Sequence, residues 1–263
     1  MKASDTVANP TVEFLNTALE AIVAAEHVLM GYFNNTVDIA IKLDNSPVTQ
    51  ADIEANKVIL DIISRQWPEH AILSEEGGIA NSKSDYLWVV DPLDGTKNYI
   101  RGIPLFGTQI ALLRASEIIL GASKLPALGE LLYSAKNLGA FLDENRVRVS
   151  TIDSLSKSYI NLGGLNHFAG GGRSQNVLQL ANSAARVRSV GDSYGYHLVA
   201  TGRCEAVIES KVQMWDIAPF IQIVQEAGGT CTDIDGRPLT LESTTIVCSN
   251  GKIHQAVLNI LTG

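Results

Sequence analysis

An apolar segment runs directly into two carboxylates in WVVDPLDGTK, residues 88–97. The β-branched start predicts a buried strand, and open α/β sheets bind their ligands beyond such strand ends. Asp91 and Asp94, three positions apart around a proline, can face one point and share a hard cation. Gly95 permits a tight turn, after which its amide and that of Thr96 can open a helix and point at an anion. An Asx-turn followed by a helix N-cap is an alternative that fits this pattern equally well.

Two further segments place carboxylates where predicted buried elements end or begin. Glu75 and Glu76 follow the short apolar run 71–73 and precede two glycines. One of them can bind a metal while the other faces outward, and an ordinary solvated turn is the alternative. Asp216 opens an almost wholly apolar helix that ends at Gly228, and we expect it as the N-cap of that helix. Because a buried carboxylate must be paired or bind a metal, an N-cap role and a ligand role are compatible.

The N-terminal part of the chain is predicted to be helical. Apolar spacing indicates a helix from about Pro10 to Phe33, and residues 42–48 indicate a turn or a short hairpin. A second helix begins near Thr49 and stops before residue 68, which is a proline. Its start resembles a capping box with Asp52 in place of the usual glutamate. Asp52 can instead pair with a threonine hydroxyl elsewhere in the fold.

After this second helix the pattern changes to short apolar runs that are rich in β-branched residues, as strands are. Strands are predicted at 71–73, 86–90, 108–113, 118–122, 130–133, 159–162, 206–209 and 245–248. Helices are predicted at 173–185, 194–201, 216–227 and 253–261. This order predicts an α+β half, residues 1–145, that carries most of the metal ligands. An α/β half, residues 146–263, would carry Asp216 and the substrate contacts.

The composition limits the class of protein. Of 263 residues 46% are hydrophobic and 18% charged, which is typical of a folded globular protein rather than a disordered one. The formal net charge of −8 disfavours nucleic-acid binding. No apolar run is long enough to span a membrane, and Asp5, Pro10 and Glu13 would interrupt the core of a signal peptide. We therefore expect a cytoplasmic protein that binds neither nucleic acid nor membranes.

The cysteines, the histidines and a glycine-rich segment indicate no competing chemistry. The cysteines are expected as buried free thiols in a reducing compartment, and the histidines as surface or satisfied core residues. Residues 163–173 lack the lysine of a P-loop and are predicted to be a mobile loop that acts as a plain connector, with a loop that covers a site as the alternative. The remaining candidate ligands are oxygens, which favour Mg²⁺ or Mn²⁺ and a phosphate. The cysteines and histidines to which this applies are Cys204, Cys231, Cys248, His27, His70, His167, His197 and His254.

Taken together, four motifs resemble those of the inositol monophosphatase family, in the family's order and spacing over residues 10–255. They are Pro47-Val48-Thr49-x-Ala51-Asp52, Ser74-Glu75-Glu76, Asp91-Pro92-Leu93-Asp94-Gly95-Thr96 and Trp215-Asp216-x-Ala218. The resemblance implies a layered αβαβα sandwich of the inositol monophosphatase and fructose-1,6-bisphosphatase type. It also implies Mg²⁺-dependent hydrolysis of a small phosphate monoester by a water molecule. Further expectations from the resemblance are a homodimer and inhibition by Li⁺.

The resemblance implies a set of metal ligands. Glu75, Asp91 and the backbone carbonyl of Leu93 would hold a first Mg²⁺, and Asp91, Asp94 and Asp216 a second. Glu75 would also contact a weaker third ion, and Mn²⁺ is the alternative metal. Two or three divalent cations would invert the potential of the carboxylate cluster, so that a phosphate dianion can enter.

The same resemblance implies roles for the residues around the metals. Thr96, paired with Asp52, would orient and deprotonate the attacking water, and the amides of Gly95 and Thr96 would receive the phosphate. The predicted catalytic residues are Asp52, Thr96 and Glu75. Glu76 and Lys97 would sit just behind the ligands.

The substrate is predicted from residues 188–196, which are similar to the R-x-x-G-D-x-x-x-Y pattern of the family's histidinol-phosphate phosphatases. In that branch Asp192 and Glu209 would face a cationic amino alcohol; inositol 1-phosphate is the other monoester considered. Lys97 also occurs in the 3′(2′),5′-bisphosphate nucleotidase branch, which Asp192 disfavours. An alternative of another class is a non-catalytic regulatory protein that binds metal and phosphate. It is disfavoured because the chain keeps both Thr96 and Asp52.

Overall fold

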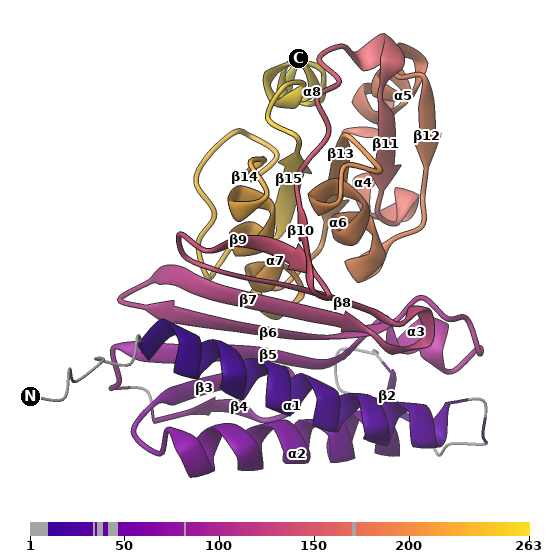
Figure 1. Ribbon diagram of the computed structural model, residues 1–263. Helices are drawn as coiled ribbons and strands as arrows, with labels where there is room; N and C mark the ends of the chain where they lie inside the picture. The colour runs from indigo at the N-terminus through magenta and orange to yellow at the C-terminus, as the bar shows by residue number, and fades with distance from the viewer. Residues whose placement is uncertain (1–9, 34, 36–38, 42–46, 82, 170–171) are drawn as a thin grey trace, which may run out of the picture.

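The computed structural model of the protein describes residues 10–33, 35, 39–41, 47–81, 83–169 and 172–263. Two β-sheets alternate with three layers of helices (Figure 1), and a separate hydrophobic core fills each of the three spaces beside the sheets. This is the predicted αβαβα sandwich, so the predicted fold class is confirmed. The helical layers are α1 (Pro10–Tyr32) with α2 (Gln50–Gln66), then α6 (Asp192–Ala200) with α7 (Met214–Glu226), and then α4 (Leu165–Ala169), α5 (Ser174–Ser183) and α8 (His254–Thr262).

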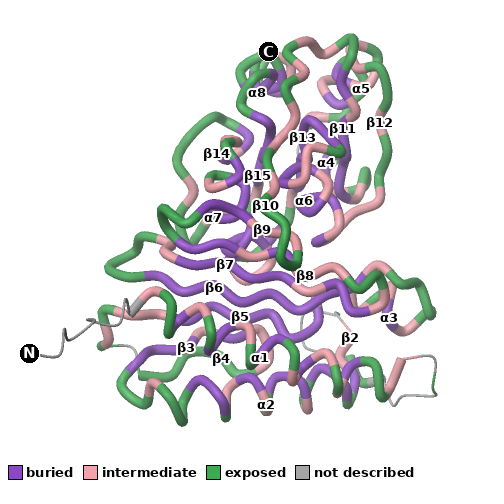
Figure 2. The backbone as a smooth tube through the Cα atoms, viewed as in Figure 1, coloured by how far each residue is buried: buried purple, intermediate pink, exposed green. Residues whose placement is uncertain are grey.

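The first sheet is mixed and has eight strands. They are β3 (Ala71–Ser74), β4 (Gly78–Ala80), β5 (Tyr86–Asp94), β6 (Gly107–Arg114), β7 (Glu117–Leu125), β8 (Glu130–Ala135), β9 (Gly139–Leu142) and β10 (Asn145–Val147), in the order β10-β9-β8-β7-β6-β5-β3-β4. Figure 2 shows that β5, β6 and β7 are buried along most of their length, because helices cover both faces of the sheet. The centre of this sheet is therefore well packed on both faces, and it supports the side chains at the ends of these strands.

The second sheet has five strands and follows in the chain. They are β11 (Tyr159–Leu162), β12 (Arg186–Arg188), β13 (Ala206–Ser210), β14 (Thr230–Thr232) and β15 (Thr245–Ser249), in the order β12-β11-β13-β15-β14. A separate antiparallel pair, β1 (Ile39–Ile41) with β2 (Pro47–Thr49), flanks the predicted hairpin, whose residues 42–46 lie outside the described residues. The division into halves at residues 145 and 146 stays a prediction, because the core between the two sheets takes side chains from both.

The predicted long helices and the eight predicted strands are confirmed, with ends that differ by a few residues. The strands that the sequence patterns missed are short. The four edge strands β4, β10, β12 and β14 have three residues each, so they contain no apolar run that could have indicated them. Among the described residues, no helix has both the length and the apolar content to cross a bilayer.

The start of α7 differs from the prediction. The N-cap is Gln213, and Asp216 is the third residue of the helix, where its Oδ2 accepts the Gln213 N–H at 2.7 Å. The prediction that Asp216 is the N-cap is therefore wrong, because the two apolar residues before it are already helical. The predicted end is confirmed: Gly228 follows the C-cap and has φ 94°, a conformation that favours glycine.

Two of the three cysteines form a disulfide, so the prediction of three free thiols is wrong. Cys231 on β14 and Cys248 on β15 are bonded, and Cys204 is free and buried. The pair is 17 residues apart in sequence, but the antiparallel register places the two residues opposite each other with Cα atoms 4.3 Å apart. Sequence spacing alone does not show which residues a register makes opposite.

Candidate active site

Three aspartates meet at the carboxyl end of β5. Asp91 and Asp94 come from β5 and Asp216 from the first turn of α7, and one carboxylate oxygen of each lies within 4.8 Å of the others. The register between β5 and β6 shifts between Asp91 and Asp94, so the strand is irregular where the two side chains converge. Oδ1 of Asp91 accepts the N–H of Leu93 at 3.0 Å, and Oδ2 of Asp94 accepts the N–H of Ser193 at 2.8 Å. The predicted ligands from the two halves of the sequence are thus brought together.

Glu75 joins the aspartates from β3. Ser74 is opposite Val90 in the parallel pair of β3 and β5, so Glu75 follows the end of β3 next to Asp91 on β5. The Glu75 N–H donates to the carbonyl of Val90 at 3.1 Å. Its carboxylate is close enough to raise the pKa of Asp91 and of Asp216. Glu76 is half-buried and directly follows it.

The cluster is hard to ionise in the absence of a cation. Burial, followed by the charge of Glu75, raises the pKa of Asp91 well above its usual value. Burial, followed by the charge of Asp192, does the same to the pKa of Asp94, and burial raises the pKa of Asp216 to about 7. A divalent cation favours the ionised carboxylates and so opposes these shifts. Because the donors are all oxygens, the residues fit Mg²⁺ or Mn²⁺.

Asp52 and Thr96 form the predicted pair beside this cluster. Oδ2 of Asp52 accepts the N–H and the hydroxyl of Thr49 at 2.7 and 2.6 Å, which completes the capping box of α2. Its other oxygen, Oδ1, lies 3.2 Å from the hydroxyl of Thr96, which is also 3.0 Å from the carbonyl of Leu93. Asp52 therefore serves both as the capping-box residue of α2, through Oδ2, and as the partner of a distant threonine hydroxyl, through Oδ1. Burial raises the pKa of Asp52, and the threonine hydrogen bonds oppose that effect.

Gly95 opens the short helix α3 (Thr96–Tyr99) in the left-handed region, with φ 81°. A Cβ at this position would lie 2.9 Å from the carbonyl oxygen of Leu105 and 3.4 Å from Oδ2 of Asp192. The tight turn and the helix opening predicted for this glycine are therefore confirmed. The first amides of a helix have no partner within it, which is the property that the predicted phosphate contact requires.

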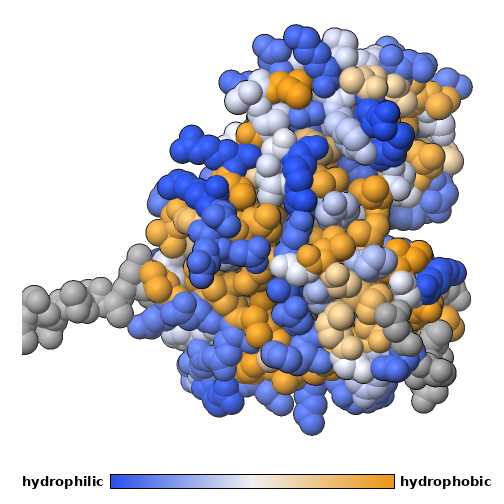
Figure 3. All heavy atoms as spheres, turned by 45° about the vertical axis from the view of Figure 1, so that its right-hand side comes forward, coloured by the Kyte–Doolittle hydropathy of each residue, from blue (hydrophilic) through white to orange (hydrophobic). Residues whose placement is uncertain are grey.

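A small cavity of about 90 Å³ adjoins the aspartates and contains both predicted substrate residues. The N–H of Asp192 donates to Oε1 of Glu209 at 3.1 Å, and the hydroxyl of Tyr196 donates to Oε2 at 2.7 Å. Asn98 donates to Oδ2 of Asp192 at 2.9 Å. Burial, the largest effect, raises the pKa of Asp192, and the exposed Lys97 opposes it. Figure 3, in which the right-hand side of Figure 1 is turned forward, shows the surface indented between the upper and lower parts.

Several residues of this cavity were not predicted. Tyr196 ends the R-x-x-G-D-x-x-x-Y pattern, so a signal for it was present, whereas no pattern pointed to Lys211 or to Asn98, which contacts Asp192 from outside the cavity lining. Lys211 lines the cavity with φ 64°, which is unfavourable for a residue with a side chain. His167 also lines the cavity, and its Nδ1 lies 2.9 Å from the carbonyl oxygen of Ser210. This histidine is thus neither a simple surface residue nor a core residue.

The glycine-rich segment is part of the site rather than a plain connector. Gly163 and Gly164 line the cavity, and residues 165–169 form α4. A Cβ on Gly163 would lie 2.9 Å from Cγ of Glu209, so the close approach to this side chain requires a glycine. The prediction is therefore wrong for 163–169, and residues 170–171 lie outside the described residues.

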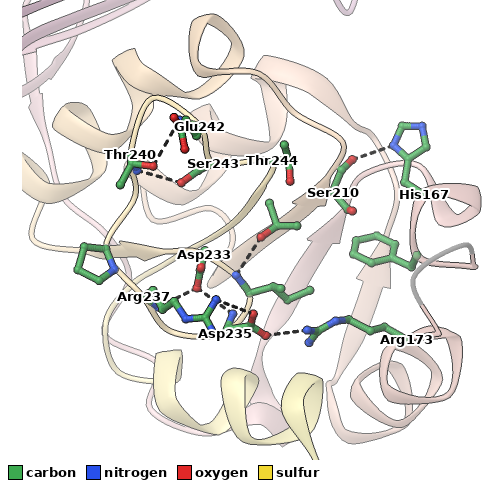
Figure 4. Close-up of a pocket in the computed structure, with 14 residues that line it drawn as sticks. His167, Arg173, Ser210, Asp233, Asp235, Arg237, Thr240, Glu242, Ser243 and Thr244 are labelled. Carbon is green, nitrogen blue, oxygen red and sulfur yellow. Dashed lines mark hydrogen bonds and ion pairs between the residues drawn. The ribbon is translucent and has the colours of Figure 1, made fainter.

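A second, larger cavity of about 510 Å³ shares His167 and Ser210 with the first (Figure 4). Arg173 donates to Asp235 at 2.6 Å across its wall, and Asp233 accepts the backbone N–H groups of Asp235 and Arg237. Most of the residues that line it are polar, so it extends the hydrophilic surroundings of the site away from the carboxylate cluster.

The chain is similar to known proteins over nearly its whole length. A sequence model of the inositol monophosphatase family matches residues 11–262. The chain is 36% identical to a histidinol-phosphatase of Chlorobaculum parvum over 93% of this chain and 95% of that one. It is 33% identical to an inositol-1-monophosphatase of Mesorhizobium japonicum over 93% and 94%.

A solved structure of this family has the same fold as this chain. The Thermotoga maritima IMPase superposes with a TM-score of 0.87 at 31% identity, over 95% of this chain and 96% of that one. These matches confirm the resemblance seen in the motifs, and with the shared fold they show that this chain belongs to the inositol monophosphatase family.

Proposed function

We propose that this protein is a phosphomonoesterase that depends on two to three Mg²⁺ ions. The observation that carries the proposal is the convergence of Asp91, Asp94 and Asp216 within 4.8 Å, with Glu75 beside them. The carbonyl of Leu93 completes the proposed ligand set. When bound, the ions neutralise the carboxylates and the phosphate, and lower the pKa of the attacking water. The two relatives, a histidinol-phosphatase and an inositol-1-monophosphatase, support this reaction class.

The chain's own residues position the water and the phosphate. The Thr96 hydroxyl holds the attacking water, and Asp52, whose raised pKa makes it a better base than an exposed aspartate, takes up the proton through Thr96. The amides of Gly95 and Thr96 hold the phosphate oxygens at the start of α3. Positioning and electrostatics of this kind supply most of the rate enhancement in phosphoryl transfer.

The proposed substrate is the phosphate ester of an amino alcohol, with histidinol phosphate favoured over inositol 1-phosphate. Four carboxylates line the small cavity, against one lysine, Lys211. Burial raises the pKa of Glu209 to about 8, so a substrate ammonium group beside it would gain a strong partner by ionising it. A second phosphate, as in adenosine 3′,5′-bisphosphate, would meet the same carboxylates and be repelled. The four are Asp94, Asp192, Glu209 and Asp216.

The test is phosphate release in Mg²⁺ from L-histidinol phosphate, inositol 1-phosphate and adenosine 3′,5′-bisphosphate at equal concentrations. We expect the highest kcat/KM for histidinol phosphate. Glu209→Gln should lower that value by about tenfold or more and affect inositol 1-phosphate less, because it removes the negative charge that only an ammonium group needs. Preference for the bisphosphate would assign the chain to the nucleotidase branch. Release from none of the three would favour a non-catalytic binding protein.

A homodimer and inhibition by Li⁺ are proposed from the family resemblance, and a cytoplasmic location is proposed from the sequence analysis. Light scattering of the purified protein tests the first, and phosphate release in increasing LiCl tests the second. Fractionation of the source cells tests the third.

A further inference from the structure

Gln109 is a buried amide without a partner. It lies on β6 with no exposed surface, and neither its Nε2 nor its Oε1 has a hydrogen-bond partner among the residues that the structure describes. Nearly all buried polar groups are hydrogen-bonded, because burial removes water and something must replace it. An apolar side chain of the same size would avoid this cost. The glutamine therefore needs an explanation beyond packing.

The strand register places Gln109 beside two of the aspartates. On β6, Gln109 is opposite Asp91, and Gly107 is opposite Asp94. Opposite residues in antiparallel strands have Cβ atoms about 4.5–5.5 Å apart, so the side chains of Gln109 and Asp91 leave the sheet on the same face. That face is covered by α6 and α7, and α7 supplies the third aspartate, Asp216.

Gly107 lies beside the amide, although the contact that most strictly requires a glycine there is with the backbone carbonyl oxygen of Lys124, 2.5 Å from where a Cβ would be. A Cβ placed on Gly107 would lie 3.1 Å from Nε2 of Gln109, so the glutamine side chain extends along β6 toward this glycine. The Nε2 nitrogen therefore lies along β6 between position 109, which is opposite Asp91, and position 107, which is opposite Asp94. This is the interval in which the register shifts and the two carboxylates converge. A nitrogen donor is the polar group that a carboxylate pair can use.

We infer that Gln109 is a positioning residue for the metal centre, with Nε2 donating to the Asp91–Asp94 carboxylate pair in the metal-loaded protein. The amide holds the carboxylates in the orientation that binds the ions. This inference rests on the proposed metal site. Ligating carboxylates are themselves usually hydrogen-bonded, and loss of such a partner typically weakens metal binding by about 10–100-fold.

Gln109→Met tests the inference, because methionine keeps the length and volume of the side chain but has no N–H donor. Titration with Mn²⁺, followed by the EPR signal of the free ion, should show a dissociation constant raised about tenfold or more. Excess Mg²⁺ should restore much of the activity that the variant loses at low Mg²⁺. The melting temperature of the metal-free variant should equal or exceed that of the wild type, because an unsatisfied buried amide is gone. If Gln109 had only a structural role, the variant would bind Mn²⁺ as the wild type does and its metal-free form would melt at a lower temperature.

Ser134→Ala is the matched control. The Ser134 hydroxyl on β8 is also buried without a partner, but the residue is opposite Gly121 and Ala140 rather than a proposed ligand. This variant should bind Mn²⁺ as the wild type does. Wild-type affinity in Gln109→Met would overturn the inference and leave the proposed function standing, whereas a wild-type protein that binds no Mn²⁺ would overturn both. Should the methionine variant fail to fold, Gln109→Leu carries the same expectations.

Discussion

Asp94 connects the first sheet to the helices between the two sheets through a single carboxylate. It extends from β5, accepts the N–H of Ser193 at the start of α6 and lies against Asp216 at the start of α7. Burial and the charge of Asp192 raise its pKa well above the usual value, so its ionised form is costly unless a cation is present. One side chain thus combines a structural contact with the proposed binding of metal.

Asp94→Asn separates these two roles. The variant keeps the volume and an acceptor for the Ser193 N–H, but it removes one anionic ligand from the proposed metal site. We expect kcat/KM to fall by about 10²-fold or more. In EDTA the melting temperature should be unchanged or higher, because repulsion within the cluster is relieved. Phosphate release at limiting Mg²⁺ and a thermal melt measure the two effects, and near-wild-type activity at limiting Mg²⁺ would disprove the metal assignment.

Thr96→Val tests the proposed water-positioning pair. Valine has nearly the shape of threonine but lacks the hydroxyl that lies 3.2 Å from Asp52, so kcat should fall by about 10²–10⁴-fold while KM changes little. The expected loss of stability is about 1 kcal/mol. Thr108→Val is the control, since it removes a buried hydroxyl bond of 2.9 Å to the carbonyl of Pro92. Equal losses of kcat in both variants, measured by initial rates of phosphate release, would argue against a special role for Thr96.

At the level of single residues, the sequence predicted what short motifs contain. Asp91 and Asp94 lie within one strand end, and Asp52 within one helix start, so local patterns were enough to find them. Gln109 and Asn98 were missed because their roles depend on which residue the register or the helix packing brings opposite. Such pairings are a property of the folded sheets and are not visible in the spacing along the chain.

The helix α6, which carries Asp192 into the site, is anchored by a buried polar network at its other end. Nε2 of His197 lies 2.8 Å from the hydroxyl of Ser123 on β7, and its Nδ1 lies 3.0 Å from Glu130 on β8. Arg203 donates to both carboxylate oxygens of Glu130 at 2.8 and 2.9 Å. These hydrogen bonds lower the pKa of Glu130 to about 2. The network therefore ties α6 to the first sheet, and the part made by Glu130 is complete only while Glu130 is ionised.

This network predicts a loss of stability in acid. Because the pKa of Glu130 is lower in the folded protein, its contribution is complete above the ordinary value and is lost as the pH falls from about 4.5 toward 2. Burial also lowers the pKa of His197, so protonation below about pH 6.5 favours the unfolded chain in the same direction.

Glu130→Gln should therefore lower the free energy of unfolding at pH 7 by about 1–3 kcal/mol and reduce its dependence on pH between 5 and about 2. Urea unfolding at several pH values measures both effects. Glu117→Gln is the control, because the Glu117–Lys136 pair is largely exposed and should contribute less than about 1 kcal/mol. An unchanged acid slope in Glu130→Gln would show that the network does not control acid stability.

Elements differed in how well the sequence predicted them, and the reason is size. The helices α1 and α2 and the central strand β5 contain enough periodic apolar residues to be recognised. The three-residue edge strands contain too few apolar residues to be recognised. The disulfide between Cys231 and Cys248 was missed with them, because it follows from the pairing of the edge strand β14 with β15. The predicted N-cap of α7 was three residues too late, because a capping box and a simple N-cap both place an acidic residue near the start of a helix.

At the scale of the whole molecule, the two sheets meet at a concentration of negative charge. Asp91 and Asp94 belong to the first sheet, Glu209 belongs to the second, and Asp216 lies on the helix between them. Burial, and after it the charges of the neighbouring carboxylates, raises the pKa of these groups, so their ionisation opposes folding at neutral pH. A cation bound between them would join the two parts instead of separating them.

Divalent metal should therefore stabilise the whole molecule and not only the site. If Mg²⁺ binds the folded chain alone, a concentration 100-fold above the dissociation constant adds about 2.7 kcal/mol. For a chain of 263 residues this corresponds to a rise of roughly 5–10 °C in melting temperature. Thermal melts in EDTA and in increasing Mg²⁺ at constant ionic strength measure the shift, which Asp94→Asn should largely abolish. The same rise in both proteins would mean that Mg²⁺ acts elsewhere on this acidic chain, and that the two sheets are held together without it.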